Sequence, residues 1–294
     1  MSKEIKKIKV TYEDRIDKYI SSNSDFSRAQ VQKLITHHAL YVDNILVRKP
    51  KFIVNPDQEI VIHPIKLKPI KALPEQLDLN IIYEDDDIII INKQSGVVVH
   101  PAPGNYTGTL VSGLLHKFKT LSTVDEELRP GVVHRIDKDT SGLLVFAKNN
   151  EAHKFLATQL KMHKIKRSYL AWVVGKITHK VIHVDLPIGR NPQMRQKMAV
   201  TQTNSKVAKT HIFVQKIVDN YTLIRCELET GRTHQIRVHL SHIGHPIVGD
   251  PVYGHKIDDF GQRLHAYELT FVHPRTKQEM TFNAPLPKEF NDFL

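Results

Sequence analysis

The chain has 294 residues, of which 40% are hydrophobic and 25% charged, and its formal net charge at pH 7 is +11. This length allows more than one domain, and the composition is that of a folded rather than a disordered protein. The single cysteine, Cys226, excludes an internal disulfide and a cysteine-based zinc site, and the positive charge favours a polyanionic partner, with nucleic acid ahead of a membrane.

Neither the start of the chain nor its apolar runs indicate a membrane protein. Residues 1–7 are charged and lack the apolar segment of a signal peptide. The longest apolar runs, such as 88–91, are far too short to span a bilayer. We therefore expect a cytoplasmic protein with no membrane partner.

Residues 12–64 are predicted to form a small α/β domain. Apolar residues recur at helical spacing over 14–20, and a second helix is predicted to begin at a capping residue, Ser27. Short strands separated by turn residues follow between 40 and 62. The basic side chains expected at exposed positions of this domain are Arg28, Lys33, Arg48 and Lys49.

This order of elements resembles an S4-type RNA-binding domain. The resemblance implies that the four basic side chains contact phosphates, which gives affinity without reading sequence. From composition alone, a solvated basic face on a small packing domain is the alternative. The proline- and lysine-rich stretch 65–76 is predicted to be a linker, followed by a larger second domain over 77–294.

The stretch 131–148 carries the densest set of reactive side chains. Apolar runs at 131–133 and 143–147 flank polar, turn-forming residues, which predicts a strand, a tight turn and a buried strand. Asp137 lies in this turn with a cation on either side, one of them Arg135, and is a candidate nucleophile or base. A solvated turn whose polar side chains bond to their own backbone is the alternative.

Further along the chain, a helix is predicted from Asn150 and a strand over 168–174. Tyr169 shares one face of this strand with apolar residues, so periodicity alone favours a core role over a catalytic one. Another strand is predicted over 221–228, and a helix from Thr233.

Histidines are dense at this last helix. Histidine is the commonest metal ligand, but the His-x-x-His spacing lacks the glutamate of the metalloprotease motif, and no cysteine can complete a structural site. The sequence therefore predicts no metal, and it predicts packing, capping or RNA contacts for His234, His239, His242 and His245.

The sequence His-Arg-Ile-Asp at 134–137, with Asp-Thr-Ser-Gly-Leu-Leu at 139–144, resembles the signature of the RluA-type pseudouridine synthases. Two further stretches match motifs of this family: Lys-Arg-Ser-Tyr-Leu-Ala at 166–171 and Gly-Arg-Thr-His-Gln-Ile-Arg-Val-His at 231–239. Asn-Lys-Gln-Ser-Gly at 92–96 matches another motif, except that glutamine stands where proline is typical.

The resemblance covers residues 77–288 and implies roles for individual residues. Asp137 is the expected catalytic carboxylate, and Arg237 is the guanidinium that keeps a buried carboxylate charged and oriented. Tyr169 is expected to stack on the target uracil. The expected substrate-binding residues are His134, Arg135 and Thr140.

The reaction implied by the resemblance moves the ribose C1′ bond of uridine from N1 to C5 without a redox change, so no cofactor is expected. Flipping a base costs a few kcal/mol, which favours an accessible uridine in a structured RNA. Arg135 is expected to enter the space that the target nucleotide leaves. The sequence leaves open whether Asp137 attacks C1′ or C6, or starts an elimination at the ribose.

The expected fold is therefore α+β, with an extended, mostly antiparallel sheet and a central catalytic cleft, preceded by the small S4-like domain. The expected function is that of a pseudouridine synthase, an isomerase that acts as a monomer on ribosomal RNA. Large-subunit (23S) RNA is the expected substrate, because 186–200 resembles the branch that modifies it. A catalytically silent RNA-binding assembly factor and a metal-dependent RNA hydrolase are the alternatives.

Overall fold

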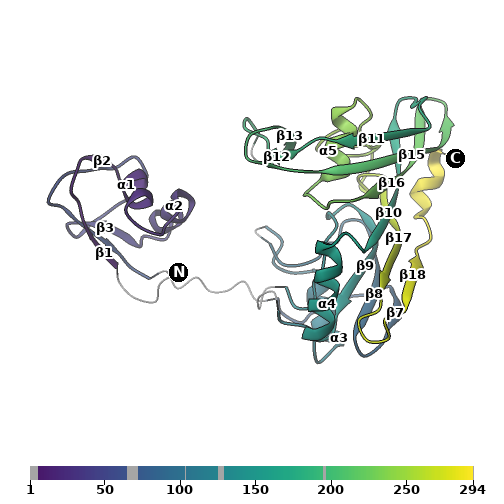
Figure 1. Cartoon of the computed structure of the whole chain (residues 1–294), viewed down its shortest axis with the longest axis horizontal. Coiled ribbons are helices and arrows are strands. Elements are labelled where there is room, and N and C mark those ends of the chain that lie inside the picture. The colour runs from purple at the N-terminus through teal and green to yellow at the C-terminus, as the bar shows by residue number, and fades with distance from the viewer. Residues whose placement is uncertain (1–5, 65–71, 103, 125–128, 195–196, 294) are drawn as a thin grey trace. The chain divides into compact units, whose positions relative to one another are not determined.

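The chain forms two compact units, Met1–Lys68 and Pro69–Leu294, and each is considered by itself (Figure 1). The computed structural model describes residues 6–64, 72–102, 104–124, 129–194 and 197–293.

The first unit combines two helices with short strands. A four-stranded antiparallel sheet has the order β1-β6-β3-β4, and β2 pairs with β5 separately. The bounds are β1 (Lys6–Lys9), β2 (Asp14–Arg15), α1 (Ile16–Ser22), α2 (Arg28–Thr36), β3 (Leu40–Val42), β4 (Ile45–Leu46), β5 (Ile53–Val54) and β6 (Glu59–Ile62).

Helix α2 begins where the sequence predicts. The Ser27 hydroxyl accepts a hydrogen bond from the backbone N–H of Gln30, and the Gln30 side chain accepts one from the backbone N–H of Ser27. This capping box satisfies two N–H groups that the helix itself leaves unpaired. Strand β1 lies outside the predicted 12–64 and joins the unit by pairing with β6. Most of the predicted linker, at 65–71, lies outside the described residues.

The second unit is built around one large sheet with the order β11-β15-β16-β10-β17-β9-β8-β7, in which β18 also pairs with β17. Every pairing in it is antiparallel except that of β17 with β9, so the expected mostly antiparallel sheet is confirmed. The elements are β7 (Ile81–Glu84), β8 (Ile88–Lys93), α3 (Leu110–Lys117), β9 (Ser141–Ala147), α4 (Asn150–Lys161), β10 (Lys166–Val174), β11 (Val181–Asp185), β12 (Ile188–Arg190), β13 (Met198–Val200), β14 (Ser205–Lys206), β15 (Lys209–Val218), β16 (Tyr221–Leu228), α5 (Gln235–His242), β17 (Leu264–Val272), β18 (Glu279–Asn283) and the 3₁₀ helix η1 (Lys288–Phe293).

Helices cover both faces of the sheet at β8. Ile88 and Ile90 pack with apolar residues of α4, whereas Ile89 and Ile91 pack with those of α3. Helix α5 contributes to the same core as α3. A strand buried on both faces reads as a continuous apolar run, which is the pattern of this strand in the sequence.

The predicted strand at 131–133 is wrong. In this described stretch only Val132 forms a bridge, to Phe146. The neighbouring Gly131 instead bonds to two different segments, because its N–H donates to the carbonyl of Ser122 and its carbonyl accepts from the N–H of Ala147. The segment is therefore held as an irregular connection and not as part of a ladder.

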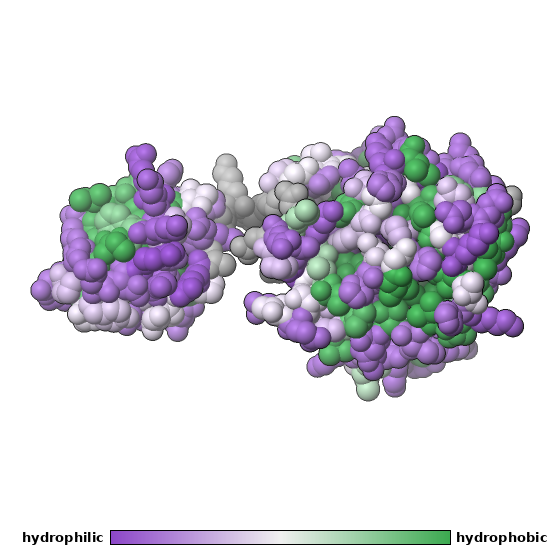
Figure 2. All heavy atoms as spheres, turned by 90° about the horizontal axis from the view of Figure 1, so that it is seen from above, coloured by the Kyte–Doolittle hydropathy of each residue, from purple (hydrophilic) through white to green (hydrophobic). Residues whose placement is uncertain are grey.

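The surface carries the predicted basic side chains. Figure 2 shows charged and polar side chains around the apolar areas on the visible face of each unit. Among the described residues, no helix has both the length and the apolar character needed to cross a membrane. The four basic residues predicted for RNA contact are all exposed in the first unit: Arg28, Lys33, Arg48 and Lys49.

The parallel contact between β9 and β17 requires glycine at Gly142. This residue pairs with Ala266 and has φ +109°, in a region that L side chains rarely adopt. A Cβ atom at Gly142 would lie 2.2 Å from the carbonyl oxygen of Ala266, which is backbone and cannot rotate away. The start of β9 is thereby pressed against a central strand of the sheet.

We expect Gly142→Ala to lower the free energy of unfolding of the second unit by about 3 kcal/mol, because it combines backbone strain with a collision. Urea unfolding followed by the fluorescence of Trp172 measures this, since Trp172 is the single tryptophan and is buried in that unit. Gly244→Ala is the matched control, because Gly244 has φ +88° but no atom within 4 Å of its Cβ position, and it should cost about 1 kcal/mol. Equal losses in the two variants would contradict the close approach.

Candidate active site

A cleft of about 540 Å³ lies over the middle of the large sheet, within the usual size of ligand sites. Its walls come from the loop 133–140 before β9, from the end of β16 with the loop into α5, and from side chains of β10 and α4. The cleft therefore gathers all three segments that carry the strongest sequence motifs.

The side chain of Arg237 joins two carboxylates at the base of this cleft. Its Nη1 donates to Asp137 Oδ2 at 2.8 Å, and its Nε and Nη2 donate to Asp250 at 2.7 and 2.9 Å. The exposed fraction of the side chain is 0% for Asp250, 5% for Arg237 and 18% for Asp137. Of the two carboxylates that Arg237 binds, Asp137 is thus the one that a ligand in the cleft can reach.

Asp250, in the turn after α5, anchors the side chain of Arg237. Its Oδ1 accepts hydrogen bonds from the backbone N–H groups of Val252 at 2.8 Å and Tyr253 at 3.0 Å. Burial raises the pKa of Asp250, but the bonds from Arg237 and from this backbone lower it further, to below the ordinary value. Burial likewise lowers the pKa of Arg237, and the two aspartates more than offset this, so that Arg237 stays charged.

His234 faces the second oxygen of Asp137. Its Nε2 lies 3.9 Å from Asp137 Oδ1, and its Nδ1 lies 2.9 Å from the hydroxyl of Tyr253. Burial, only partly opposed by Asp137, lowers the pKa of His234 below its ordinary value, so the imidazole is neutral at pH 7. The Tyr253 ring also lies 5.1 Å from the guanidinium carbon of Arg237, within cation–π range.

Side chains of the motif at 92–96 support the loop that carries Asp137. Lys93, only 1% exposed, donates to three backbone carbonyls, one of which is that of Lys138 at 2.7 Å. Ser95 donates to the carbonyl of Asp139 at 3.0 Å. Burial lowers the pKa of Lys93 to about 7, against the opposing effect of the loop aspartates. Side chains of the motif at 92–96 therefore hold the loop in place by hydrogen bonds to the backbone of the loop.

The three predicted catalytic residues, Asp137, Tyr169 and Arg237, all line the cleft. Tyr169 also belongs to the main hydrophobic core and is 5% exposed, and burial raises the pKa of its hydroxyl. Tyr169 therefore lies both in the hydrophobic core and at the wall of the cleft. Sequence reasoning missed Asp250 and His234 as members of the site.

The predicted substrate-binding residues also line the cleft, but they differ in how much the protein already engages them. Arg135 is exposed, and its Nη1 lies 3.3 Å from His100 Nε2. His134 Nε2 accepts a bond from the backbone of β9, and burial lowers the pKa of His134 to about 3. The Thr140 hydroxyl is buried and accepts a bond from Gln262. Arg135 is thus the freest of the three to reach a ligand.

The dense histidines do not converge on one point. His239 bonds to the hydroxyl of Thr210 and the carbonyl of Leu186, each at 2.9 Å. His245 bonds to the carbonyl of Val174 at 2.9 Å. These contacts serve packing between segments, which is one of the roles that the sequence predicts.

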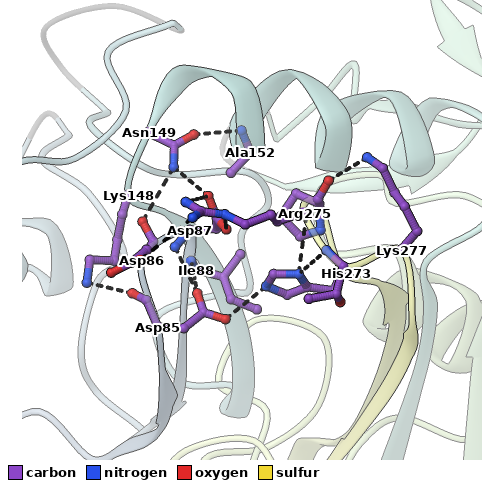
Figure 3. Close-up of polar contacts among 12 residues, drawn as sticks. Asp85, Asp86, Asp87, Ile88, Lys148, Asn149, Ala152, His273, Arg275 and Lys277 are labelled. Atoms are coloured by element: carbon purple, nitrogen blue, oxygen red, sulfur yellow. Dashed lines mark hydrogen bonds and ion pairs between the residues drawn. The ribbon is translucent and has the colours of Figure 1, made fainter.

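A second polar cluster lies where the turn between β7 and β8 meets the end of β17, and there Asp85, Asp87 and His273 present atoms within 4.8 Å of one another (Figure 3). Each oxygen of the two carboxylates already accepts a hydrogen bond, including those from Arg275 and His273. Asn149, the N-cap of α4, also donates to Asp87 at 2.8 Å. The cluster therefore holds together the β7–β8 turn, α4 and the segment after β17, and its polar atoms are used in these contacts.

Comparison with known proteins shows which families this chain is similar to. The family model of RNA pseudouridylate synthases matches residues 87–242, and that of the S4 domain matches residues 14–60. An uncharacterized RNA pseudouridine synthase of Bacillus subtilis, YlyB, is 45% identical over 96% of this chain and 93% of its own length. The ribosomal large subunit pseudouridine synthase D of Pseudomonas aeruginosa is 41% identical over 90% of this chain and 86% of its own.

A solved structure agrees with these relatives. Human RNA pseudouridylate synthase domain containing 1 is similar with a TM-score of 0.60 and 26% identity, over 76% of this chain and 87% of that one. The similarity extends across the motifs that line the cleft, because the matched residues 87–242 include those of the loop at 133–140, of β10 and of α5. The chain belongs to the RNA pseudouridylate synthase family, and it is an isomerase of the pseudouridine synthase class with an S4 domain at its N-terminal side.

Proposed function

We propose that this enzyme converts uridine to pseudouridine in large-subunit ribosomal RNA, with Asp137 as the catalytic carboxylate. The observation that carries the catalytic assignment is the 2.8 Å contact from Arg237 Nη1 to Asp137 Oδ2 at the base of the cleft. The choice of RNA is supported by the relative from Pseudomonas aeruginosa, which is named for the large ribosomal subunit.

In the proposed reaction, Asp137 acts on the flipped uridine while Arg237 fixes the orientation of its carboxylate. The C1′–N1 bond breaks, the uracil turns, and a C1′–C5 bond forms, after which C5 loses its hydrogen to solvent as a proton and N1 takes up a proton. No net oxidation or reduction occurs. The face of Tyr169 is the platform that keeps the freed uracil in the cleft, and Arg135 fills the space left in the RNA stack.

The exposed basic side chains of the first unit are proposed to dock the RNA. Arg28, Lys33, Arg48 and Lys49 form no ion pair among the described residues, so their charges are available to phosphates. Such contacts release counterions and give affinity that does not depend on base sequence.

Release of tritium from RNA labelled at uridine C5 tests the catalytic assignment. With large-subunit RNA made without this enzyme, the wild type should release tritium, and Asp137→Asn should release none while its RNA affinity stays within a few fold. Asp86→Asn is the matched control, because Asp86 is an exposed aspartate that does not line the cleft, and it should behave as the wild type.

Near-normal release by Asp137→Asn would refute the role of Asp137. A wild type that binds large-subunit RNA tightly but releases no tritium from it would instead favour the silent assembly factor.

Neutralising the basic residues of the first unit tests the docking role. Replacing Arg28, Lys33, Arg48 and Lys49 by Gln should weaken RNA binding and reduce the slope of log affinity against log salt by about 3, since each phosphate contact contributes about 0.7 to 0.9. Binding titrations at several salt concentrations measure this slope.

The matched control removes Lys6, Lys7 and Lys9, which lie in the same unit but are each ion-paired with an acidic residue. That triple Gln variant should change the slope much less. Equal changes per removed charge in the two variants would show that net charge, and not these four positions, accounts for binding.

A further inference from the structure

Among the described residues, the side chain of Arg167 in the cleft forms no hydrogen bond or ion pair. Arg167 lies on β10 two residues before Tyr169, and both side chains line the cleft. Its Nε is buried without a hydrogen bond, and among the described residues its guanidinium forms no ion pair. A guanidinium is permanently charged and offers five donors. Arg167 is half-buried, so an anion bound in the cleft would add to its guanidinium the charged partner that the described residues do not supply.

The cleft makes room for this side chain at Gly231. The φ angle of Gly231 is not in the left-handed region, so its backbone conformation does not require glycine. A Cβ atom there would instead lie 2.9 Å from Nη1 of Arg167. The absence of a side chain at Gly231 therefore allows the observed position of the guanidinium.

The charges around Arg167 also favour an anion. The acidic side chains of the cleft lining are Asp137 and Glu229, and both are already engaged, the first by Arg237 and the second by His211 at 2.7 Å. The remaining charged side chains of the lining are cations, namely Arg135, Lys161, Arg167 and Arg232. Among the described residues, neither of the two carboxylates forms an ion pair with Arg167.

We propose that Arg167 binds a backbone phosphate that flanks the target uridine. This inference rests on the proposed function and deepens it, because it assigns a contact to the substrate's backbone at the same site. Two residues along a strand span about 6.6 Å, which is comparable with the size of one nucleotide. A uracil stacked on Tyr169 thereby brings a neighbouring phosphate within reach of Arg167, and guanidinium matches phosphate with paired hydrogen bonds.

Neutral phosphates test the contact directly. A synthetic RNA fragment that contains the uridine modified by the wild type is prepared with a methylphosphonate at its 5′ or its 3′ phosphate. At one of these positions the wild type should lose about tenfold in kcat/KM, as expected for a charged hydrogen bond. Arg167→Met should lose a similar factor on the natural RNA and nothing more on that modified RNA.

Lys166→Met is the matched control, because Lys166 is the exposed neighbour of Arg167 and does not line the cleft. It should keep wild-type activity on the natural RNA and the full tenfold loss on the modified RNA. Gly231→Ala keeps the charge of Arg167 but displaces its guanidinium, and it should show a partial loss of the same kind.

The inference is overturned if the losses from Arg167→Met and from the methylphosphonate multiply at both positions, or if Arg167→Met is as active as the wild type. These results would leave the proposed function intact, because the wild type still forms pseudouridine in the natural RNA. A wild type that forms none would reject the proposed function instead. The salt dependence of RNA binding would then still test the phosphate contact, because Arg167→Met should reduce the slope of log affinity against log salt by about 0.7 to 0.9, and an unchanged slope would overturn the inference.

Discussion

The contacts of the Arg237 guanidinium are those on which the candidate site depends, because they link Asp137, which lies 100 residues away in sequence, to an anchor at Asp250. On one side the guanidinium is held by Asp250, which is fully buried and fixed by backbone N–H groups. On the other side it orients Asp137. Buried ion pairs add little net stability, but removing one partner leaves a charge unpaired at high cost. The positions of Asp137, Arg237 and Asp250 relative to one another are therefore determined by α5 and the turn that follows it.

The loop that carries Asp137 is fixed from other directions as well. Lys93 and Ser95 bond to its backbone carbonyls, and directly after it Gly142 lies against Ala266 on a central strand. A carboxylate on a loop with few such supports would sample many orientations, whereas this one is held before substrate binds. The polar groups that surround this short turn are therefore the cause of its rigidity.

Local patterns in the sequence predicted most elements near the site, and long-range contacts account for what they missed. The strand at 221–228 has clear periodicity and forms as predicted, and the helix predicted from Asn150 forms as α4. Helix α3 was not predicted, since Ser112 and Gly113 lie in its short span and are poor helix formers. The motifs identified Asp137 and Arg237, but nothing in the spacing indicates that Asp250 pairs with Arg237 or that Arg167 lacks a partner.

The rate of pseudouridine formation by Asp250→Asn under single-turnover conditions tests this account most directly. The variant keeps a similar shape but loses the charge that orients Arg237, so the account predicts a rate about a hundredfold lower with RNA affinity within a few fold. Asp258→Asn, which alters another aspartate–arginine pair outside the cleft, should retain the normal rate. A near-normal rate for Asp250→Asn, in a protein shown by Trp172 fluorescence to be folded, would contradict the account.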